Sequence, residues 1–397
     1  MTEFVTGMAK GESGEEAALK AVKQAKENLN DQNINFSVVF SSTEYNYHEV
    51  LETVERETGN SKIIGCTTAG EFTEKGPQMG SVAVGLVSGD DIKFFSGVGD
   101  GLGQDALTAL KKAAENLPEQ VDGFPYKSVL NLHDGLAGKG TQVTWNTIET
   151  VGQDAKVAGG SAGDDLQLQE TCVFKGNECF TNSVALGMLA TKDPVVLTVD
   201  HGHEPISPPI TVTKSDGSTV YEFDDRPAFD VWKEQIRGNA EENLGINVDH
   251  IEPGSDELSN LMTRYGIGIQ SSEGFKVRWP GLTSETDGPL QFACDLPEGS
   301  VIRIMASPKD KQIEAARRAA RNAVEKMGDR EVAGALVFEC IVRATILDDK
   351  FRESVKAISE EINAPLLGFE SYGEVCIERG EMSGFHNTTT VVMLLPK

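Results

Sequence analysis

The stretch Leu366–Glu374 reads LLGFESYGE, and two near copies of it occur earlier in the chain. These copies are IIGCTTAGE at Ile63–Glu71 and VAGGSAGD at Val157–Asp164. Each copy begins with apolar residues typical of a buried strand and ends in a hydroxyl side chain, a glycine and an acid. The glycine permits a tight turn, and the hydroxyl and carboxylate groups can bind amides of that turn. The repeated stretch therefore predicts three strands that each end in a structured turn.

The sequence around each copy follows one order of elements. A short strand precedes an alanine-rich helix, in which apolar residues recur at helical spacing, as at Ala18, Val22 and Ala25. A strand, a second helix, the repeated stretch and a last strand follow, and the last strands Ser81–Val87 and Ser183–Leu189 are nearly identical. This order predicts an α/β fold of mixed sheets with crossover helices, built from three internal units.

The spacing of the copies predicts the domain organisation. The first two units run in tandem and form residues 1–192. An insert with hairpins and a helix near Pro227–Arg237 is expected at 193–298, where turn-forming sequences separate short alternating runs. The third unit is expected at 299–397, beginning with the strand IRIMA at Ile302–Ala306.

A strand, helix, strand crossover implies parallel neighbours, so both strands of a unit end at the same edge of the sheet. Crevices in open α/β sheets form outside that carboxyl edge. Thr68, Ser161 and Ser371 follow the second strand of their units and are expected to occupy equivalent places there. For the first two copies, a motif that only closes a turn is the favoured interpretation.

The third copy carries Tyr372 where the other two have alanine, and reactive groups gather at the same predicted edge. A cation, an acid, an aromatic face and amide donors together suit an amino acid or a similar zwitterion. The predicted ligand-binding residues are Cys340, Arg343, Tyr372, Gly373, Glu374, His386 and Asn387, with Arg278 of the insert as a lid contribution.

Two other interpretations of these residues stay open. Arg343 and Glu374 could form an ion pair that only ties down the end of the chain. A cysteine-dependent hydrolase would use Cys340 or Cys66 as nucleophile and His386 as base. Because no GxCxG elbow surrounds either cysteine and Cys66 lies in a strand that looks buried, the prediction is that the protein is not an enzyme.

Composition limits the partners. The 397 residues include 62 acidic and 36 basic side chains, and the formal charge of −26 would repel a nucleic acid backbone. Apolar runs such as Val391–Leu395 are too short to span a membrane, and Met1–Lys10 lacks an apolar signal-peptide stretch. We therefore expect a cytoplasmic protein without membrane insertion. The six cysteines form no CxxC and are expected to be mostly buried thiols, with a disulfide or zinc pair between Cys172 and Cys179 as the alternative.

An ordered set of motifs covers nearly the whole chain. It comprises IIGCTTAGEF, VAGGSAGDDL, TCVFKGNECFTNSVALGMLA, HGHEPISPPITVTKSDGSTVYEFDDRPAFDVW, GFKVRWPG, CDLPEGSVIRIM, ALVFECIVR and PLLGFESYGEVCIERGEMSGFHNTTTVVMLL. In this order the motifs resemble the FIST family (F-box and intracellular signal transduction proteins), through both its N-terminal and its C-terminal domain. His203 stands where the pattern of the family has an aromatic residue, usually tryptophan.

The resemblance implies a sensory, small-ligand-binding module of a signalling pathway, with amino acids as proposed ligands. Because the chain has no room for a kinase, methyl-accepting, cyclase or F-box segment, it would signal through a separate partner protein. Some relatives bind haem and sense nitric oxide, so a haem-binding sensor is the alternative function. No histidine here has a haem-specific context, and His201 with His203, or His133 beside Asp134, lacks an apparent third metal ligand, so no cofactor or metal is predicted.

Overall fold

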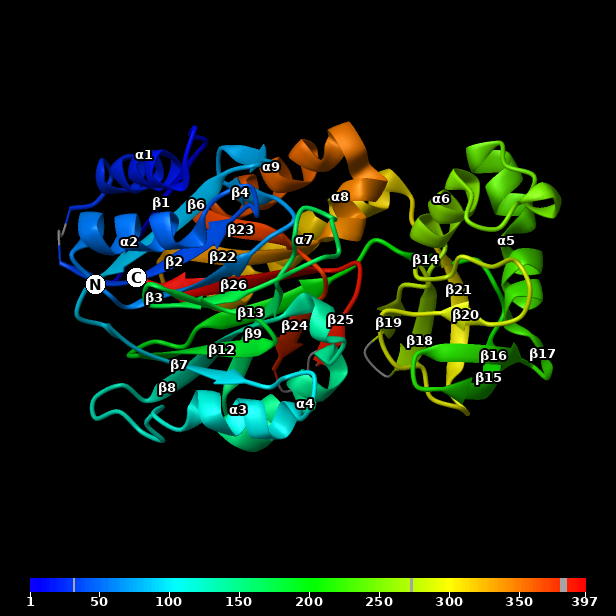
Figure 1. Cartoon of the computed structure of the whole chain (residues 1–397), viewed down its shortest axis with the longest axis horizontal. Helices are drawn as coiled ribbons and strands as arrows, with labels where there is room; N and C mark the ends of the chain where they lie inside the picture. The colour runs from blue at the N-terminus through cyan, green and yellow to red at the C-terminus, as the bar shows by residue number, and fades with distance from the viewer. Residues whose placement is uncertain (31–32, 272–273, 379–383) are drawn as a thin grey trace.

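The structure is a computed structural model that describes residues 1–30, 33–271, 274–378 and 384–397. In these residues the strands form four sheets, and helices cover their outer faces, so the mixed α/β fold is confirmed (Figure 1). Three six-stranded sheets form a body, on the left in Figure 1, and an eight-stranded sheet forms a lobe on the right. No helix in the described part of the chain is long and apolar enough to cross a membrane.

The first module, residues 3–88, sets the pattern of the body. Its elements are β1 (Glu3–Ala9), α1 (Gly14–Lys26), β2 (Ile34–Ser41), α2 (Tyr47–Thr58), β3 (Ile63–Thr67), β4 (Glu71–Thr73), β5 (Gly76–Gln78) and β6 (Val82–Ser88). In its sheet β6 runs antiparallel to β1 and β2, and β2 runs parallel to β3. The side chains of Ser13 and Asn46 accept bonds from backbone amides and so begin the two helices.

The second module, residues 92–191, has the same pairing. Its elements are β7 (Ile92–Asp100), α3 (Ala106–Ala114), β8 (Tyr126–His133), η1 (Gly135–Ala137), α4 (Gly140–Val151), β9 (Lys156–Ser161), β10 (Val173–Lys175), β11 (Glu178–Phe180) and β12 (Ser183–Thr191). Here β12 runs antiparallel to β7 and β8, and β8 runs parallel to β9.

The third module joins two separate parts of the chain. Its elements are β13 (Val196–Asp200), α7 (Lys309–Met327), β22 (Val332–Cys340), α8 (Ile341–Leu347), η3 (Asp348–Lys350), α9 (Phe351–Ile362), β23 (Leu366–Ser371), β24 (Glu374–Ile377), β25 (Gly384–His386) and β26 (Thr390–Pro396). Because β13 pairs with β26 as β1 pairs with β6, β13 fills the place of a first strand.

The lobe, residues 201–308, interrupts the third module between its first strand and its first helix. Its elements are β14 (Glu204–Pro205), β15 (Ile210–Asp216), β16 (Thr219–Phe223), β17 (Arg226–Pro227), α5 (Ala228–Leu244), η2 (Val248–His250), α6 (Asp256–Arg264), β18 (Ile267–Ser271), β19 (Gly274–Arg278), β20 (Leu290–Gln291) and β21 (Val301–Ala306). The expected first strand of the third unit, Ile302–Ala306, lies in β21 and pairs with β15 and β18 of the lobe instead. The lobe has its own core around Trp232, Phe223 and Phe229.

Each module lends a hairpin to the sheet of another module. Strand β4 of the first module pairs with β23 of the third, β24 of the third pairs with β9 of the second, and β10 of the second pairs with β3 of the first. The three exchanges close a cycle. Each six-stranded sheet is therefore complete only when two modules are folded together, and the three sheets as a set require all three modules.

A glycine of the receiving strand lies opposite each exchanged hairpin. A Cβ atom at Gly368 would lie 2.2 Å from the ring of Phe72, which no side chain at that position could tolerate. The same glycine recurs in each copy of the repeated stretch, opposite an apolar hairpin residue. The pairs are Phe72 with Gly368, Phe174 with Gly65, and Val375 with Gly159.

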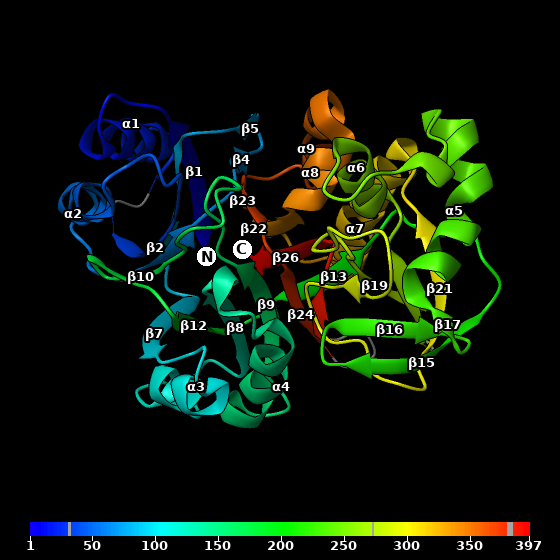
Figure 2. The same cartoon turned by 45° about the vertical axis from the view of Figure 1, so that its right-hand side comes forward.

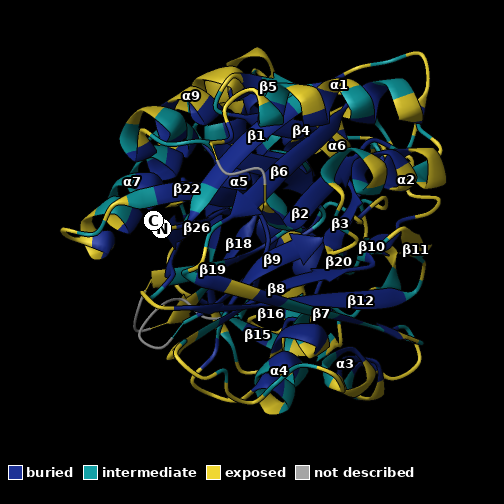
Figure 3. Ribbon diagram, turned by 90° about the vertical axis from the view of Figure 1, so that its left-hand side faces the viewer, coloured by how far each residue is buried: buried dark blue, intermediate teal, exposed yellow. Residues whose placement is uncertain are grey.

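The inner faces of the sheets share one core, and the helices lie outside it. The rings of Phe40 and Phe369, from the first and third modules, are 4.5 Å apart, and Leu130 of the second module packs in the same cluster. Figure 2 shows α1 and α2, α3 and α4, and α7 to α9 placed around the sheets. In Figure 3 the strands are buried over most of their length, while exposed residues gather on the outer sides of the helices.

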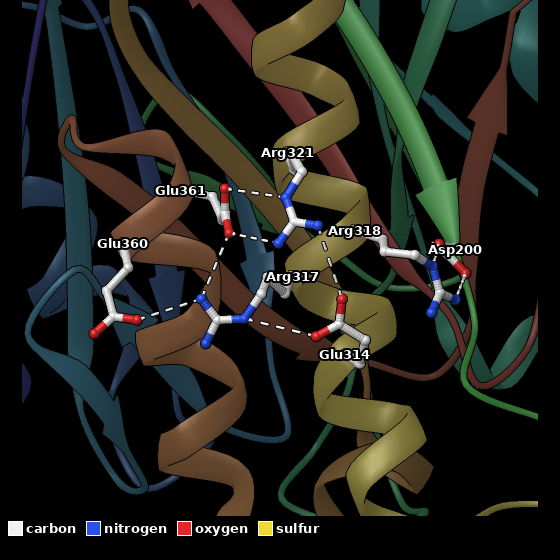
Figure 4. Close-up of polar contacts among 7 residues, drawn as sticks. All are labelled: Asp200, Glu314, Arg317, Arg318, Arg321, Glu360 and Glu361. Atoms are coloured by element: carbon white, nitrogen blue, oxygen red, sulfur yellow. Dashed lines mark hydrogen bonds and ion pairs between the residues drawn. The ribbon is translucent and has the colours of Figure 1, made fainter.

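Ion pairs on the outside of the third module connect its two parts (Figure 4). Arg318 of α7 donates two hydrogen bonds to Asp200 at the end of β13, at 3.0 and 2.9 Å. Arg321 and Arg317 of the same helix pair with Glu361 of α9 at 2.9 and 3.5 Å. Partly exposed pairs contribute little energy each. The bidentate pair with Asp200 nevertheless holds α7 beside β13, although the whole lobe separates these two elements in the sequence.

The register shifts the second copy of the repeated stretch. Ser41 and His133 both face the first valine of the last strand of their module, and they lie opposite Thr67 and Ser161. Ser161 is therefore equivalent to Thr67. The expectation from the sequence, that Ser161 is equivalent to Thr68, is wrong. The second module also has more residues between this turn and its hairpin than the other two modules have. Asp164 is therefore not equivalent to Glu71 and Glu374.

We predict that Phe72→Ala loosens the third module more than the first, because Phe72 packs edge-on against Phe351 of α9 at 6.0 Å. The free energy of unfolding should fall by about 3–5 kcal/mol, and native-state hydrogen exchange should speed up in α9. Phe174→Ala is the matched control, since Phe174 packs against Tyr47 of α2 at 5.6 Å and should loosen α2. Faster exchange in α1 and α2 of Phe72→Ala, with α9 unchanged, would contradict the exchanged arrangement.

Candidate functional site

The predicted ligand-binding residues lie around the boundary between the third module and the lobe, which we call the seam. Here β25 of the body lies beside β19 of the lobe (Figure 1). Arg278 Nη1 donates to the Phe385 carbonyl at 3.2 Å, and the Cys294 thiol donates to Asn387 Oδ1 at 3.1 Å. The Asn387 amide also donates to the carbonyl of His386, which is buried. Both parts of the protein thus contribute polar groups to one buried boundary.

Arg343 is not directed to the seam. It is fully buried on α8, where its Nε donates to Glu339 Oε2 at 2.7 Å and its Nη2 to the Gln312 carbonyl at 2.8 Å. Its Nη1 binds the side-chain oxygen of Gln312. The ion pair that was considered with Glu374 is formed with Glu339 instead. Because each guanidinium nitrogen has a partner inside the third module, Arg343 has a structural role.

Glu374 is bound within its own turn. Its Oε1 accepts from Ser371 Oγ at 2.7 Å, and its Oε2 accepts from the amide and the hydroxyl of Thr389 at 3.1 and 2.9 Å. Burial raises the pKa of Glu374 to about 8, so it carries a proton at neutral pH. The backbone of Gly373 leaves room for the Phe385 ring, which would lie 2.1 Å from a Cβ atom there. These residues shape the turn.

Tyr372 connects the third module to the long turn of the second. Its hydroxyl donates to the Asp164 carboxylate and accepts from the amides of Asp164 and Leu166 at 3.2 and 3.0 Å. Its ring packs with Trp279 of the lobe against the cluster that contains Cys340. The tyrosine therefore fixes a loop and forms part of the wall of the seam.

Two adjacent residues of the lobe carry polar groups without partners. Arg278 is 7% exposed, and its Nε has no hydrogen-bond partner in the part of the chain that the structure describes. The same holds for the indole Nε1 of Trp279. Buried donors are almost always satisfied, so an unpaired one calls for a water molecule or a ligand. The sequence pattern pointed to Arg278 but not to Trp279, although both stand in the motif GFKVRWPG.

The two histidines at the entrance to the lobe are bonded within the protein. His201 Nδ1 accepts from the His203 amide at 3.2 Å, so its Nε2 donates to the Phe275 carbonyl at 2.9 Å. His203 Nδ1 lies 2.6 Å from Ser307 Oγ. Burial lowers the pKa of both rings, which are neutral at pH 7. His203 thus connects the two chain segments that lead into the lobe, while His201 binds the backbone of β19.

A third polar group, in the second module, has the composition of a catalytic triad. Ser161 Oγ lies 2.8 Å from His133 Nε2, and His133 Nδ1 lies 3.0 Å from Asn131 Oδ1. All three are buried, and burial lowers the pKa of His133 to about 3. A ring that does not take up a proton near neutral pH is a poor general base. We therefore interpret the group as a buried hydrogen-bond chain between β8 and β9.

The cavities of the body and lobe lie away from the seam. Five of them have volumes between about 330 and 940 Å³, and the described residues that line them include neither Arg278 nor Trp279 nor any histidine. Among the described residues, no group of three or more His, Cys, Asp or Glu side chains is arranged to hold a metal.

Comparisons with known proteins cover almost the whole chain. The model of the FIST N domain matches residues 35–226, and that of the FIST C domain matches residues 228–377. An uncharacterized protein of Methanocaldococcus jannaschii is 22% identical over 363 residues, which cover 85% of this chain and 68% of that protein. A solved structure described as cyanuric acid hydrolase covers 99% of each chain at 8% identity with a TM-score of 0.33, a likeness too low to bear on function.

We predict that Arg343→Met lowers the free energy of unfolding by about 3–5 kcal/mol, because it leaves the carboxylate of Glu339 buried without its partner. Adding Glu339→Gln should recover most of the loss. Urea denaturation at pH 7 measures both, with Lys356→Met as the control, since Lys356 pairs with Glu360 on an exposed surface. A change in Arg343→Met no larger than in the control would contradict the structural role.

We also predict that stability falls as the pH rises from about 4.5 to about 8. The pKa of Glu71 and of Glu374 is raised to about 8, mainly by burial, so the folded state keeps protons that the unfolded state releases above pH 4.5. Each carboxyl then lowers the free energy of unfolding by up to about 1.4 kcal/mol per pH unit. Urea denaturation at pH 5, 6.5 and 8 tests this, and Glu71→Gln with Glu374→Gln should flatten the slope. An unchanged slope in the double variant would show that these carboxyls are not the cause.

Proposed function

Because the chain belongs to the FIST family, whose domains are sensory domains of signal transduction, we propose that it is a small-ligand-binding sensory protein that acts through a separate partner protein. We place the protein in the cytoplasm, where its acidic surface favours solubility and disfavours nucleic acid partners. We propose that the ligand binds at the seam. One observation carries this placement, namely the unpaired buried donors of Arg278 and Trp279.

These donors favour a ligand that carries a carboxylate. Arginine binds carboxylates through parallel hydrogen bonds, and an indole N–H adds a further donor. Arg278 thus replaces Arg343 as the anchor, because all three nitrogens of Arg343 are engaged. An amino acid is the candidate that the family resemblance suggests. The neighbouring wall of such a site would consist of Cys340, Tyr372, Gly373, Glu374, His386 and Asn387.

Entry of a ligand requires the lobe to move from the body. Two chain segments connect the parts, one between β13 and β14 and one between β21 and α7. A ligand that satisfies the seam donors would stabilise one arrangement of lobe and body over another, which is the requirement for a sensor. The partner protein would then recognise the arrangement of the two parts.

The geometry gives little support to the cysteine hydrolase. Burial raises the pKa of the Cys66 and Cys340 thiols well above the usual value, and Glu374 adds to this for Cys340. Nucleophilic cysteines need the opposite shift, because the thiolate is the attacking group.

Haem also fits poorly with five of the six histidines of this chain. His133 and His201 use both ring nitrogens in hydrogen bonds, and His203 is buried against Ser307. His48 and His250 lie on the exposed surface. An axial ligand needs a free nitrogen that faces a cavity large enough for the macrocycle. We therefore prefer the ligand site at the seam.

We predict that a panel of amino acids and small carboxylates, read by thermal unfolding, contains a ligand that stabilises the wild-type protein. A ligand at 100 times its Kd adds about 2.7 kcal/mol to the free energy of unfolding. Arg278→Met should remove this shift, while Arg237→Met should keep it, because Arg237 is an exposed arginine of the same lobe and lies outside the seam. Equal shifts in both variants would exclude Arg278 as the anchor and move the search away from the seam.

A further inference from the structure

A separate cavity lies between the first and third modules. Its volume is about 410 Å³, and it is bounded by the hairpin β4–β5 of the first module and by α8 and the start of α9 of the third. Its walls are mixed. Apolar surface comes from Pro77, Met79, Ile341, Ala344 and Phe351, and the polar lining residues are Gln78, Thr345, Asp348, Asp349, Arg352 and Glu370. The cavity exists because of the hairpin exchange, since β4 and β5 cover the third sheet here.

Glu370 lines this cavity, and its carboxylate has no partner. The residue is 3% exposed at the end of β23, and its side chain makes no hydrogen bond or ion pair in the part of the chain that the structure describes. Its carboxylate lies beside Met79, as both would contact a Cβ atom at Gly70, at 2.7 and 2.9 Å. An unpaired buried carboxylate is costly, so its presence calls for a compensating group.

The residues equivalent to Glu370 in the other two modules have hydrogen-bond partners, so the lack of a partner at Glu370 is unusual. Thr67 of the first module bonds to Cys172, and Ser161 of the second bonds to His133. Within the third module, the neighbouring Glu339 is paired with Arg343. Glu370 alone among these three equivalent residues faces a cavity with an unsatisfied polar group.

The surroundings of Glu370 are acidic. Burial raises its pKa well above the usual value, and three neighbouring acids raise it further. These acids are Glu71 of β4, Glu339 of β22 and Asp165 of the long turn in the second module. At the rim, Asp348 and Asp349 are acidic, and Arg352 donates to the Pro77 carbonyl at 3.5 Å. Burial and the neighbouring acids therefore favour the protonated form of Glu370, and a cation that entered would favour loss of this proton.

We propose that this cavity is a ligand site, distinct from the seam, that takes a small organic cation with a primary ammonium group on an apolar body. The ammonium group contacts the Glu370 carboxylate, and the apolar body packs against Met79, Ile341 and Phe351. A metal ion fits less well, because Glu370 and the rim residues Asp348 and Asp349 do not form a group of ligands that could hold a metal among the described residues. An anion fits less well because the acids outnumber Arg352. This proposal does not depend on the seam.

Isothermal titration calorimetry of the full chain with benzylammonium chloride tests the proposal. We expect saturable binding of one equivalent at pH 7, with release of a proton that appears as a dependence of the heat on the ionisation enthalpy of the buffer. Glu370→Gln should weaken binding at least tenfold. Glu353→Gln should bind as the wild type does, because Glu353 is an exposed acid outside the cavity. Benzyl alcohol, which lacks the charge, should not bind.

Each of the other outcomes would overturn the proposal. Equal affinity of Glu370→Gln would place the ammonium elsewhere, and equal affinity of benzyl alcohol would show a merely apolar cavity. The absence of saturable binding for both benzylammonium and n-butylammonium would exclude the ligand class. If Glu370→Gln does not fold, Met79→Lys serves in its place. This variant puts an ammonium group beside Glu370 from a partly exposed position and should block the ligand.

Discussion

The exchange of hairpins between modules is the constraint on which the rest of the structure depends. Each exchanged strand has a glycine opposite its apolar residue, and Gly368 shows why one exchange requires it, because a Cβ atom there would meet the ring of Phe72. Because each hairpin starts at the carboxyl edge of one sheet and ends on the next sheet, the three carboxyl edges are drawn together. The turns that contain Ala69, Gly163 and Tyr372 consequently bond to strands of a neighbouring module. Polar groups of three modules thus meet in one buried region, which no single module could form.

Part of this arrangement can be derived from the sequence. Helical and strand spacing predict the α/β class, and the crossovers place the repeated stretch at a carboxyl edge. The exchange itself gives little signal, because β4 and β10 are three-residue strands without a pattern of their own. The role of β13 was missed because β21 is an equally short apolar strand that directly precedes α7. In both cases tertiary pairing, rather than local preference, decides where a short strand belongs.

The candidate site, too, could be predicted only in part from the sequence. The sequence brought Tyr372, Asn387 and Arg278 toward one boundary, but it paired Arg343 with the wrong acid. A helix begins directly after Cys340. Its turn brings Arg343 beside Glu339, which lies four residues earlier, and the two form an ion pair. The sequence pattern did not predict this helix. Sequence patterns can show which polar groups gather at the edge of a sheet. Only the three-dimensional structure shows which of these groups already have hydrogen-bond partners.

Satisfaction of buried polar groups is therefore the criterion that separates structure from candidate function here. Glu374 and Arg343 are buried with complete sets of partners, while Arg278 Nε and Trp279 Nε1 are buried without one, and Glu370 turns its carboxylate to a cavity. The unsatisfied groups lie near the same helix, α8. Ile341 belongs to the cluster against which Trp279 and Ala344 pack, and both Ile341 and Ala344 also line the cavity of Glu370. Because protein interiors are close-packed, a shift of this short helix at one site must be accommodated at the other. The two candidate sites share a wall, and the physical route between them is one helix of seven residues.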